Sequence, residues 1–176
     1  MSDKERKLIR RIKKGNQHAF QTLYNRYVND AIRTVYGITR NHNHTFDIVQ
    51  ETFIKVYRHL EKFDEEKPFK PWFHRILLNE SMRYSKKEAK SGIPTTDETI
   101  DYLVSSRQAK TNETLEIALE KLNPDIRTLL VLKYFNAYTE KEIAILLDLP
   151  ETTVKSRLYK ARNELKRCLG GIADEG

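Results

Sequence analysis

The chain has 176 residues, of which 39% are hydrophobic and 32% charged, and its formal net charge is +7. This composition predicts one or two small folded domains rather than a disordered chain, and the basic balance favours a polyanionic partner, either nucleic acid or an anionic membrane surface. No apolar run approaches the roughly 18–20 residues of a membrane span, and no long apolar stretch follows the basic residues at the start. We therefore expect a cytoplasmic protein. Because Cys168 is the only cysteine, an internal disulfide bond or a cysteine-based zinc site is excluded.

Residues 1–87 predict a first helical domain, because hydrophobic residues recur there at three- and four-residue spacing. Gly15 should end a short basic helix, and Pro71 suits the first turn of the fourth helix. A polar loop is expected at residues 41–44, with Thr45 as the N-cap of the helix that follows. The four predicted helices span residues 3–14, 19–35, 46–60 and 71–87.

Residues 88–111 change character, because small, polar and helix-breaking residues dominate there and the periodicity fades. We predict a flexible linker between two domains, since this segment is too long for a comfortable loop inside one compact domain. Residues 112–170 then predict a second, smaller helical domain, followed by a tail at residues 171–176. The fold class expected is therefore all-α, with two small domains and a flexible linker.

The second domain carries clear helix boundaries. A first helix should begin at Asn112 or Thr114, and Asn123 is a typical N-cap before a helix of residues 125–135, because a proline follows it. Thr139 and Glu142 have the spacing of a capping box. The glycines at positions 170 and 171 should end the last helix near residue 169.

Residues 139–169 have the pattern of a helix-turn-helix, a capped short helix, a three-residue turn and a longer basic helix. Residues 151–168 hold six Lys/Arg against two Asp/Glu, whereas residues 112–150 hold four against seven. An element that enters the major groove of DNA requires such a concentration of positive charge, although a solvated basic helix would have it too. The buried stripe should comprise Val154, Leu158, Ala161 and Leu165. The candidate DNA-contacting residues are Lys155, Ser156, Arg157, Tyr159, Lys160 and Arg162.

A second pattern interleaves aromatic and basic residues between positions 63 and 87. Single-stranded nucleic acid is bound by this combination, in which cations follow the phosphates and apolar or aromatic surfaces meet unstacked bases. The same rings could instead belong to the core, and both interpretations can hold for different rings. The aromatic members are Phe63, Phe69, Trp72, Phe73 and Tyr84, and the basic members are Lys67, Lys70, His74, Arg75, Arg83, Lys86 and Lys87.

Asp47, Gln50 and Glu51 form a third pattern, because their spacing puts them on one helix face. By itself this trio indicates a solvated surface. His42 and His44 lack a third metal ligand and indicate plain surface rather than a metal site. We find no phosphate-binding glycine loop, no catalytic constellation and no motif for a cofactor or a small-molecule substrate.

In this order the three patterns resemble the extracytoplasmic-function (ECF) sigma factors, a group of bacterial alternative sigma factors in the sigma-70 superfamily. The resemblance covers nearly the whole chain outside the linker and the tails. The matching segments are AFQTLYNRY (19–27), DIVQETFIKVY (47–57), FKPWFHRILLNESMRY (69–84), LNPDIRTLLVLKYF (122–135) and YTEKEIAILLDLPETTVKSRLYKARNEL (138–165).

The resemblance implies two helical domains, called sigma2 and sigma4, that bind core RNA polymerase, recognise the −10 and −35 promoter elements and melt the promoter, in a stress or envelope response. It implies that Asp47, Gln50 and Glu51 dock on the polymerase clamp helices. It places the last basic helix, including Lys155 and Arg157, on the −35 duplex. It also implies an anti-sigma factor, often a membrane protein, that could hold the chain at the inner membrane face. To the −10 region it assigns Trp72, Arg75 and Asn79 with their neighbours Phe63 and Ile76, and the aromatic-basic pattern adds Phe69 and Arg83.

The sequence departs from the family pattern at three positions. Phe46 stands where an acidic residue is frequent, Asp148 replaces the usual glycine of the turn, and Thr152 stands where a glycine is common. Two other classes of function are compatible with a basic helical chain. A stand-alone helix-turn-helix regulator would bind duplex sites without polymerase, and a nucleic-acid-modifying enzyme would need a nucleophile, metal or nucleotide motif that the sequence lacks.

Overall fold

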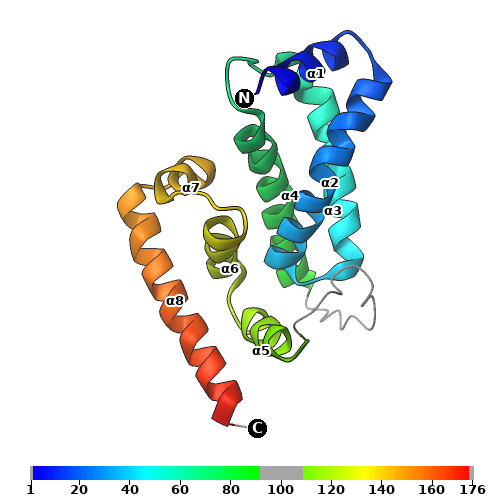
Figure 1. Ribbon diagram of the computed structural model, residues 1–176. Helices are drawn as coiled ribbons and strands as arrows, with labels where there is room; N and C mark the ends of the chain where they lie inside the picture. The colour runs from blue at the N-terminus through cyan, green and yellow to red at the C-terminus, as the bar shows by residue number, and fades with distance from the viewer. Residues whose placement is uncertain (1, 92–108, 175–176) are drawn as a thin grey trace. The chain divides into compact units, whose positions relative to one another are not determined.

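The computed structural model describes residues 2–91 and 109–174, and every regular element in these two stretches is a helix (Figure 1). The all-helical expectation is therefore confirmed. The chain divides into two compact units, one with α1, α3, α4 and most of α2, and the other with α5 to α8. The elements are α1 (Asp3–Lys13), α2 (Gln17–Thr39), α3 (His42–His59), η1 (Leu60–Lys62), α4 (Phe69–Ser91), α5 (Ala109–Glu120), α6 (Pro124–Leu130), η2 (Val131–Phe135), α7 (Glu140–Leu147) and α8 (Glu151–Asp174).

Several helix boundaries differ from the sequence-based prediction. The prediction of a polar loop at residues 41–44 with Thr45 as N-cap is wrong. Arg40 takes a left-handed backbone with φ +55°, α3 begins at His42, and Thr45 lies buried inside that helix. The glycines do not end the last helix either: α8 runs through them to Asp174, and Gly170 has no positive φ. A left-handed backbone favours glycine, but these two glycines continue a right-handed helix, in which glycine is only a weak helix former.

Helices occupy both ends of the segment expected to be a linker. Helix α4 extends to Ser91, and α5 already begins at Ala109. The rest of the expected linker, residues 92–108, lies outside the described residues, as do the last two residues of the expected tail. The predicted helix 125–135 is α-helical only through Leu130 and then widens into the π-helix η2, in which the Asn136 backbone N–H donates to the carbonyl five residues earlier.

The first unit packs around an aromatic centre. Helices α2, α3 and α4 lie side by side, and α1 lies across one end of them (Figure 1). The rings of Phe53, Phe69 and Phe73 are buried and contact each other or Tyr27 at centroid separations between 5.1 and 6.0 Å. Burial of one such ring contributes roughly 1.5–3 kcal/mol, so this cluster fixes how α4 packs against its neighbours.

A buried polar contact adds direction to this packing. His74 on α4 has no exposed surface, and its Nε2 lies 2.9 Å from Asp30 Oδ2 on α2. This hydrogen bond is the main reason why the pKa of Asp30 lies below its usual value, with smaller contributions from Lys70 and Arg33. Since the rings allow some sliding but a hydrogen bond does not, the pair fixes the register of α4 against α2.

In the second unit, side chains cap the helix N-termini and aliphatic residues form the core. Asn123 accepts a hydrogen bond from the backbone N–H of Asp125, and Thr139 and Glu142 form the predicted capping box. Leu122, Leu130 and Ala161 are buried together, and Cys168 packs against them half-buried. The single cysteine is therefore a part of the apolar packing of α8.

Candidate nucleic-acid interface

Helix α8 shows the division into buried and exposed faces that its sequence predicts. Val154, Leu158 and Ala161 are at most 1% exposed, and Leu165 is half-buried. Asp148 makes the turn before α8 with a left-handed backbone, at φ +55°. The six polar candidates are all exposed: Lys155, Ser156, Arg157, Tyr159, Lys160 and Arg162.

Two of these cations have partners within the chain. Lys155 Nζ lies 2.8 Å from Glu151 Oε1, one turn earlier, and this contact raises the pKa of Lys155 and lowers that of Glu151. Arg162 donates to the Tyr134 hydroxyl at 3.4 Å. Both contacts are exposed to solvent and therefore weak, so a phosphate or a base edge could displace them at little cost.

Helix α4 gathers most of the second set of candidates along one stripe. Trp72, Arg75, Ile76, Asn79 and Arg83 follow each other at three- and four-residue spacing and so share a face. Arg75 and Asn79 are exposed, the Arg83 side chain is 70% exposed, and Trp72 and Ile76 are half-buried. The stripe thus combines hydrogen-bonding groups in solvent with apolar groups at its base.

Phe63 and Phe69, the other two members of this set, lie in the core. Phe63 is 5% exposed and Phe69 has no exposed surface. Their ring centroids lie 4.8 and 5.6 Å from that of Trp72. Neither phenyl ring presents a face to solvent on which a base could stack, so for these two rings the core interpretation holds and they support Trp72 from beneath.

The Asp47 trio occupies the outer side of α3. Asp47 and Gln50 are exposed, and the Glu51 side chain is 40% exposed. Beside Gln50 the surface sinks into a groove of about 750 Å³ between α2 and α3. Sequence reasoning missed this groove, although the positions of its exposed apolar residues gave a signal, a second apolar stripe on α3. These residues are Phe46, Ile54 and Tyr57.

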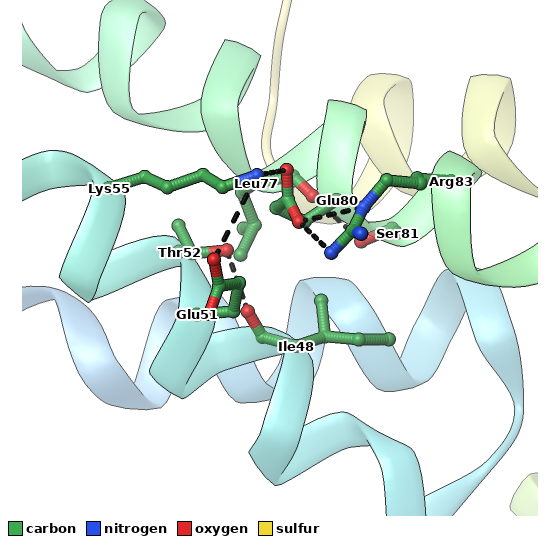
Figure 2. Close-up of polar contacts among 8 residues, drawn as sticks. All are labelled: Ile48, Glu51, Thr52, Lys55, Leu77, Glu80, Ser81 and Arg83. Carbon is green, nitrogen blue, oxygen red and sulfur yellow. Dashed lines mark hydrogen bonds and ion pairs between the residues drawn. The ribbon is translucent and has the colours of Figure 1, made fainter.

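Glu80 connects α3 to the α4 stripe (Figure 2). Its carboxylate, 7% exposed, accepts a 2.5 Å hydrogen bond from Lys55 Nζ at one oxygen and two from Arg83, at 2.7 and 3.1 Å, at the other. Burial raises the pKa of Glu80, but the hydrogen bonds from the two cations outweigh it and the pKa is lowered overall. Lys55 also lies 3.9 Å from Glu51. A chain of ion pairs, from Glu51 to Lys55 to Glu80 to Arg83, therefore links the Asp47 trio on α3 to the α4 stripe.

The described residues give no sign of a metal or a membrane-spanning site. Across residues 2–91 and 109–174, no three His, Cys, Asp or Glu side chains converge as metal ligands would. The His44 ring packs at a tilt against the Tyr84 ring, with ring centroids 4.4 Å apart. Of the helices in the same two stretches, none has both the length and the apolar character needed to cross a membrane.

Comparisons with known proteins decide which kind of nucleic-acid-binding protein this is. The sequence models of Sigma-70 region 2 and Sigma-70 region 4 match residues 23–91 and 113–165. An ECF RNA polymerase sigma-E factor of Haemophilus influenzae is 31% identical over 176 residues, which cover 90% of this chain and 92% of that protein. The chain belongs to the ECF sigma factors of the sigma-70 family.

Two further relatives agree with this membership. The ECF sigma factor SigW of Bacillus subtilis is 28% identical over 93% of this chain and 96% of its own. The solved structure of CnrH in complex with the cytosolic domain of CnrY matches with a TM-score of 0.69, at 26% identity over 96% of this chain and 99% of that one. This sigma factor directs core RNA polymerase to promoters, and it is a non-enzymatic initiation factor. The stand-alone regulator and the modifying enzyme are therefore excluded.

Proposed function

We propose that this sigma factor divides its work among three surfaces, two on the first unit and one on the second. The outer side of α3 docks on the polymerase clamp helices, the α4 stripe captures the opened −10 strand, and the exposed side of α8 reads the −35 duplex. The first unit then corresponds to a sigma2 domain within residues 1–87 and the second to a sigma4 domain within residues 112–170. The observation that carries the proposal is the α4 stripe, because duplex binding alone would not require its composition.

The stripe suits a single strand for a physical reason. Bases that leave the duplex lose their stacking and pairing partners, and a protein that replaces both stabilises the open form. Trp72 and Ile76 offer apolar surface, held from beneath by Phe63 and Phe69. Asn79 adds an amide that can both donate and accept at a base edge. Arg75 and Arg83 supply the charge that follows the phosphates.

Helix α8 suits a duplex instead. Its six candidate residues are exposed and polar or cationic, and the contacts of Lys155 with Glu151 and of Arg162 with Tyr134 are weak enough to be exchanged for DNA. Lys155, Ser156 and Arg157 lie in its first two turns, the part of a recognition helix that reaches base edges. Tyr159, Lys160 and Arg162 follow further along and are placed for phosphate or base contacts.

On α3, charge and apolar surface lie next to each other. Asp47, Gln50 and Glu51 present negative and polar groups, and the groove beside Gln50 exposes apolar side chains. Protein interfaces combine such an apolar centre with a charged rim that sets specificity and the rate of association. We therefore assign this side to the polymerase and extend it into the groove.

Regulation and location follow from the family. We propose an anti-sigma factor as an inhibitory partner, since this group is commonly regulated in that way and CnrH was solved in complex with the cytosolic domain of CnrY. Because its target is RNA polymerase, the chain should act in the cytoplasm at the nucleoid, or be held at the inner membrane face by that partner. A stress or envelope response is the corresponding physiological role.

The decisive experiment separates the two modes of DNA contact. Asn79→Ala should reduce open complexes by about tenfold or more, which corresponds to roughly 1.4 kcal/mol, as measured by permanganate reactivity of thymines at the start site. Asn29→Ala is the matched control, because Asn29 is also an exposed asparagine in the middle of a helix. Binding of a −35 duplex should stay normal in both variants.

Substitutions on α8 should weaken binding of the −35 duplex rather than capture of the opened −10 strand. Lys155→Ala and Arg157→Ala should weaken −35 duplex binding, by roughly 1–3 kcal/mol for a base contact, or uniformly across sequences with a smaller salt dependence for a phosphate contact. If Asn79→Ala opens promoters like the unmodified protein while the α8 variants bind the duplex normally, this assignment of residues is wrong.

A further inference from the structure

Helix α1 precedes the segment that matches Sigma-70 region 2, which begins at residue 23. It is nevertheless firmly attached to the first unit. Leu8, Ile9 and Ile12 lie in the same apolar core as Phe63 and Phe69. The Tyr27 hydroxyl on α2 donates to Glu5 Oε1 at 2.5 Å. The position of α1 is therefore defined on two sides, and it can serve as a support for other segments.

One such segment is the loop of residues 63–68, which connects η1 to α4. Lys13 Nζ on α1 donates to the backbone carbonyl of Phe63 at 2.7 Å and lies 3.2 Å from Glu65 Oε1. Arg10 Nε donates to the other oxygen of Glu65 at 2.6 Å. Both carboxylate oxygens of Glu65 are thus held by α1, and the same lysine fixes the backbone two residues earlier. We call Arg10, Lys13 and Glu65 the α1 clamp.

The clamp leads directly to the α4 stripe. The Phe63 ring, whose carbonyl Lys13 holds, packs against Trp72 with centroids 4.8 Å apart and edge-on against Phe69 at 5.7 Å. Trp72 is the first residue of the stripe that contains Asn79. A shift of the loop would therefore move the tryptophan, without changing any residue that meets DNA.

The neighbouring glutamate is a natural comparison. The Glu66 side chain is 74% exposed and lies 3.7 Å from Arg6 on α1, whereas the Glu65 side chain is 20% exposed and lies 2.6 Å from Arg10 and 3.2 Å from Lys13. The two residues have the same charge and adjacent positions in the same loop. They differ in how closely α1 holds them.

From this geometry we propose that the α1 clamp is a positioning device for promoter opening: Glu65 and Lys13 hold the loop of residues 63–68 so that Phe63 fixes Trp72 at the −10 surface. The proposal rests on the assignment of the α4 stripe to the opened strand. The proposal assigns no DNA contact to any of the three clamp residues. Ordering the loop in advance removes an entropic cost that would otherwise fall on strand capture, because groups that are already ordered lose less freedom on binding.

The test uses the full-length protein and Glu65→Gln against Glu66→Gln. Both glutamine substitutions raise the net charge by one, so they change the general attraction to DNA alike, whereas Lys13→Met lowers the net charge by one. In holoenzyme at saturating core polymerase, Glu65→Gln and Lys13→Met should reduce open complexes roughly two- to tenfold. Glu66→Gln should stay within about twofold of the unmodified protein. Affinity for core polymerase and for a −35 duplex should be unchanged in all three.

The single tryptophan supplies a readout that does not depend on promoters. Trp72 is the only tryptophan of the chain, so its emission reports on the site alone. Glu65→Gln and Lys13→Met should lower its anisotropy and increase its quenching by acrylamide, while Glu66→Gln should not. A melting temperature equal to that of the Glu66 variant would show that the effect is local.

Each outcome decides the matter. Equal behaviour of the two glutamine variants in both assays overturns the proposal. If Glu65→Gln lowers the anisotropy of Trp72 but leaves the amount of open complex normal, the clamp has no role in promoter opening. In that case Asn79→Ala serves as a reference: if it impairs opening, only the clamp proposal has failed, and if it does not, the assignment of α4 to the −10 strand has failed with it.

Discussion

Asp148 ends α7 with a left-handed backbone, at φ +55° and ψ +49°. For residues with a Cβ atom this region costs about 1–2 kcal/mol, less for aspartate and asparagine, and glycine enters it freely. The family's usual residue at this turn is glycine, and the structure gives the physical reason. Aspartate is tolerated here but carries a residual strain, in the turn that aims α8.

Substitution at Asp148 should therefore change stability with opposite signs. Asp148→Gly should raise the free energy of unfolding by about 0.5–1 kcal/mol, and Asp148→Ala should lower it by about the same amount, because alanine has neither glycine's freedom nor aspartate's tolerance of this region. Urea unfolding followed by circular dichroism measures both. A destabilised Asp148→Gly variant would contradict the strain argument and show that the aspartate side chain has a contact of its own.

At the scale of elements, Glu80 determines how α3 and α4 are tied together. Two cations, Lys55 from α3 and Arg83 from α4, share its buried carboxylate (Figure 2). A buried charge is stable only while it is paired. The ion pairs of Glu80 with Lys55 and Arg83 therefore need the carboxylate in its charged form and are weakened in acid.

Glu80→Gln should lower the free energy of unfolding by about 1–3 kcal/mol at neutral pH, the cost of leaving buried partners unsatisfied. The lowered pKa of Glu80 means that its contribution is complete above the unfolded value, about 4.3, and is lost as the pH falls through the folded pKa. The difference between the variant and the unmodified protein should therefore shrink in acid, where both carry a neutral group.

The control for this prediction is Glu61→Gln, which makes the same change at an exposed glutamate. It should alter stability by no more than about 0.5 kcal/mol. Denaturant unfolding followed by Trp72 fluorescence from pH 7 down to about pH 3 or below, so that the series passes through the lowered folded pKa of Glu80, measures all three proteins. A difference for Glu80→Gln that is equal at both ends of this range would mean that its charge is not the cause.

The whole molecule consists of two units, each with its own core and caps. The first is built on aromatic rings and the second on small aliphatic side chains. The single tryptophan lies in the first unit, so its fluorescence follows that unit only. A chain organised in this way can present single-strand and duplex contacts on separate bodies, as the proposed division of work requires.

We predict that fragments 1–91 and 109–176 fold independently. Each should show a helical circular dichroism spectrum and a cooperative thermal transition, because the buried residues of each unit contact one another. Fragment 109–176 should also bind a −35 duplex, and Lys155→Ala should weaken that binding. A fragment that lacks helical signal would show that the unit depends on the rest of the chain.

The sequence alone determined the all-helical character of the chain, the caps at Asn123 and Thr139, and which face of α8 is buried. These features depend on residues within a few positions of each other: Asn123 and Thr139 cap their own helices, and the apolar spacing from Val154 to Ala161 is local. Local rules failed where a boundary depended on something else, as when glycines at positions 170 and 171 were expected to end a helix that runs to Asp174.

Only the tertiary structure decided which of several equivalent residues matter. Five aromatic rings near α4 look alike in sequence, yet Phe63 and Phe69 are core while Trp72 reaches the surface, because burial depends on which helices pack around each ring. Glu65 and Glu66 are adjacent and have the same charge, but α1, some fifty residues earlier, holds Glu65 by two close contacts and Glu66 by one longer, exposed one. Contacts between residues so far apart in the chain leave no periodic pattern, and they become visible only when the helices are packed.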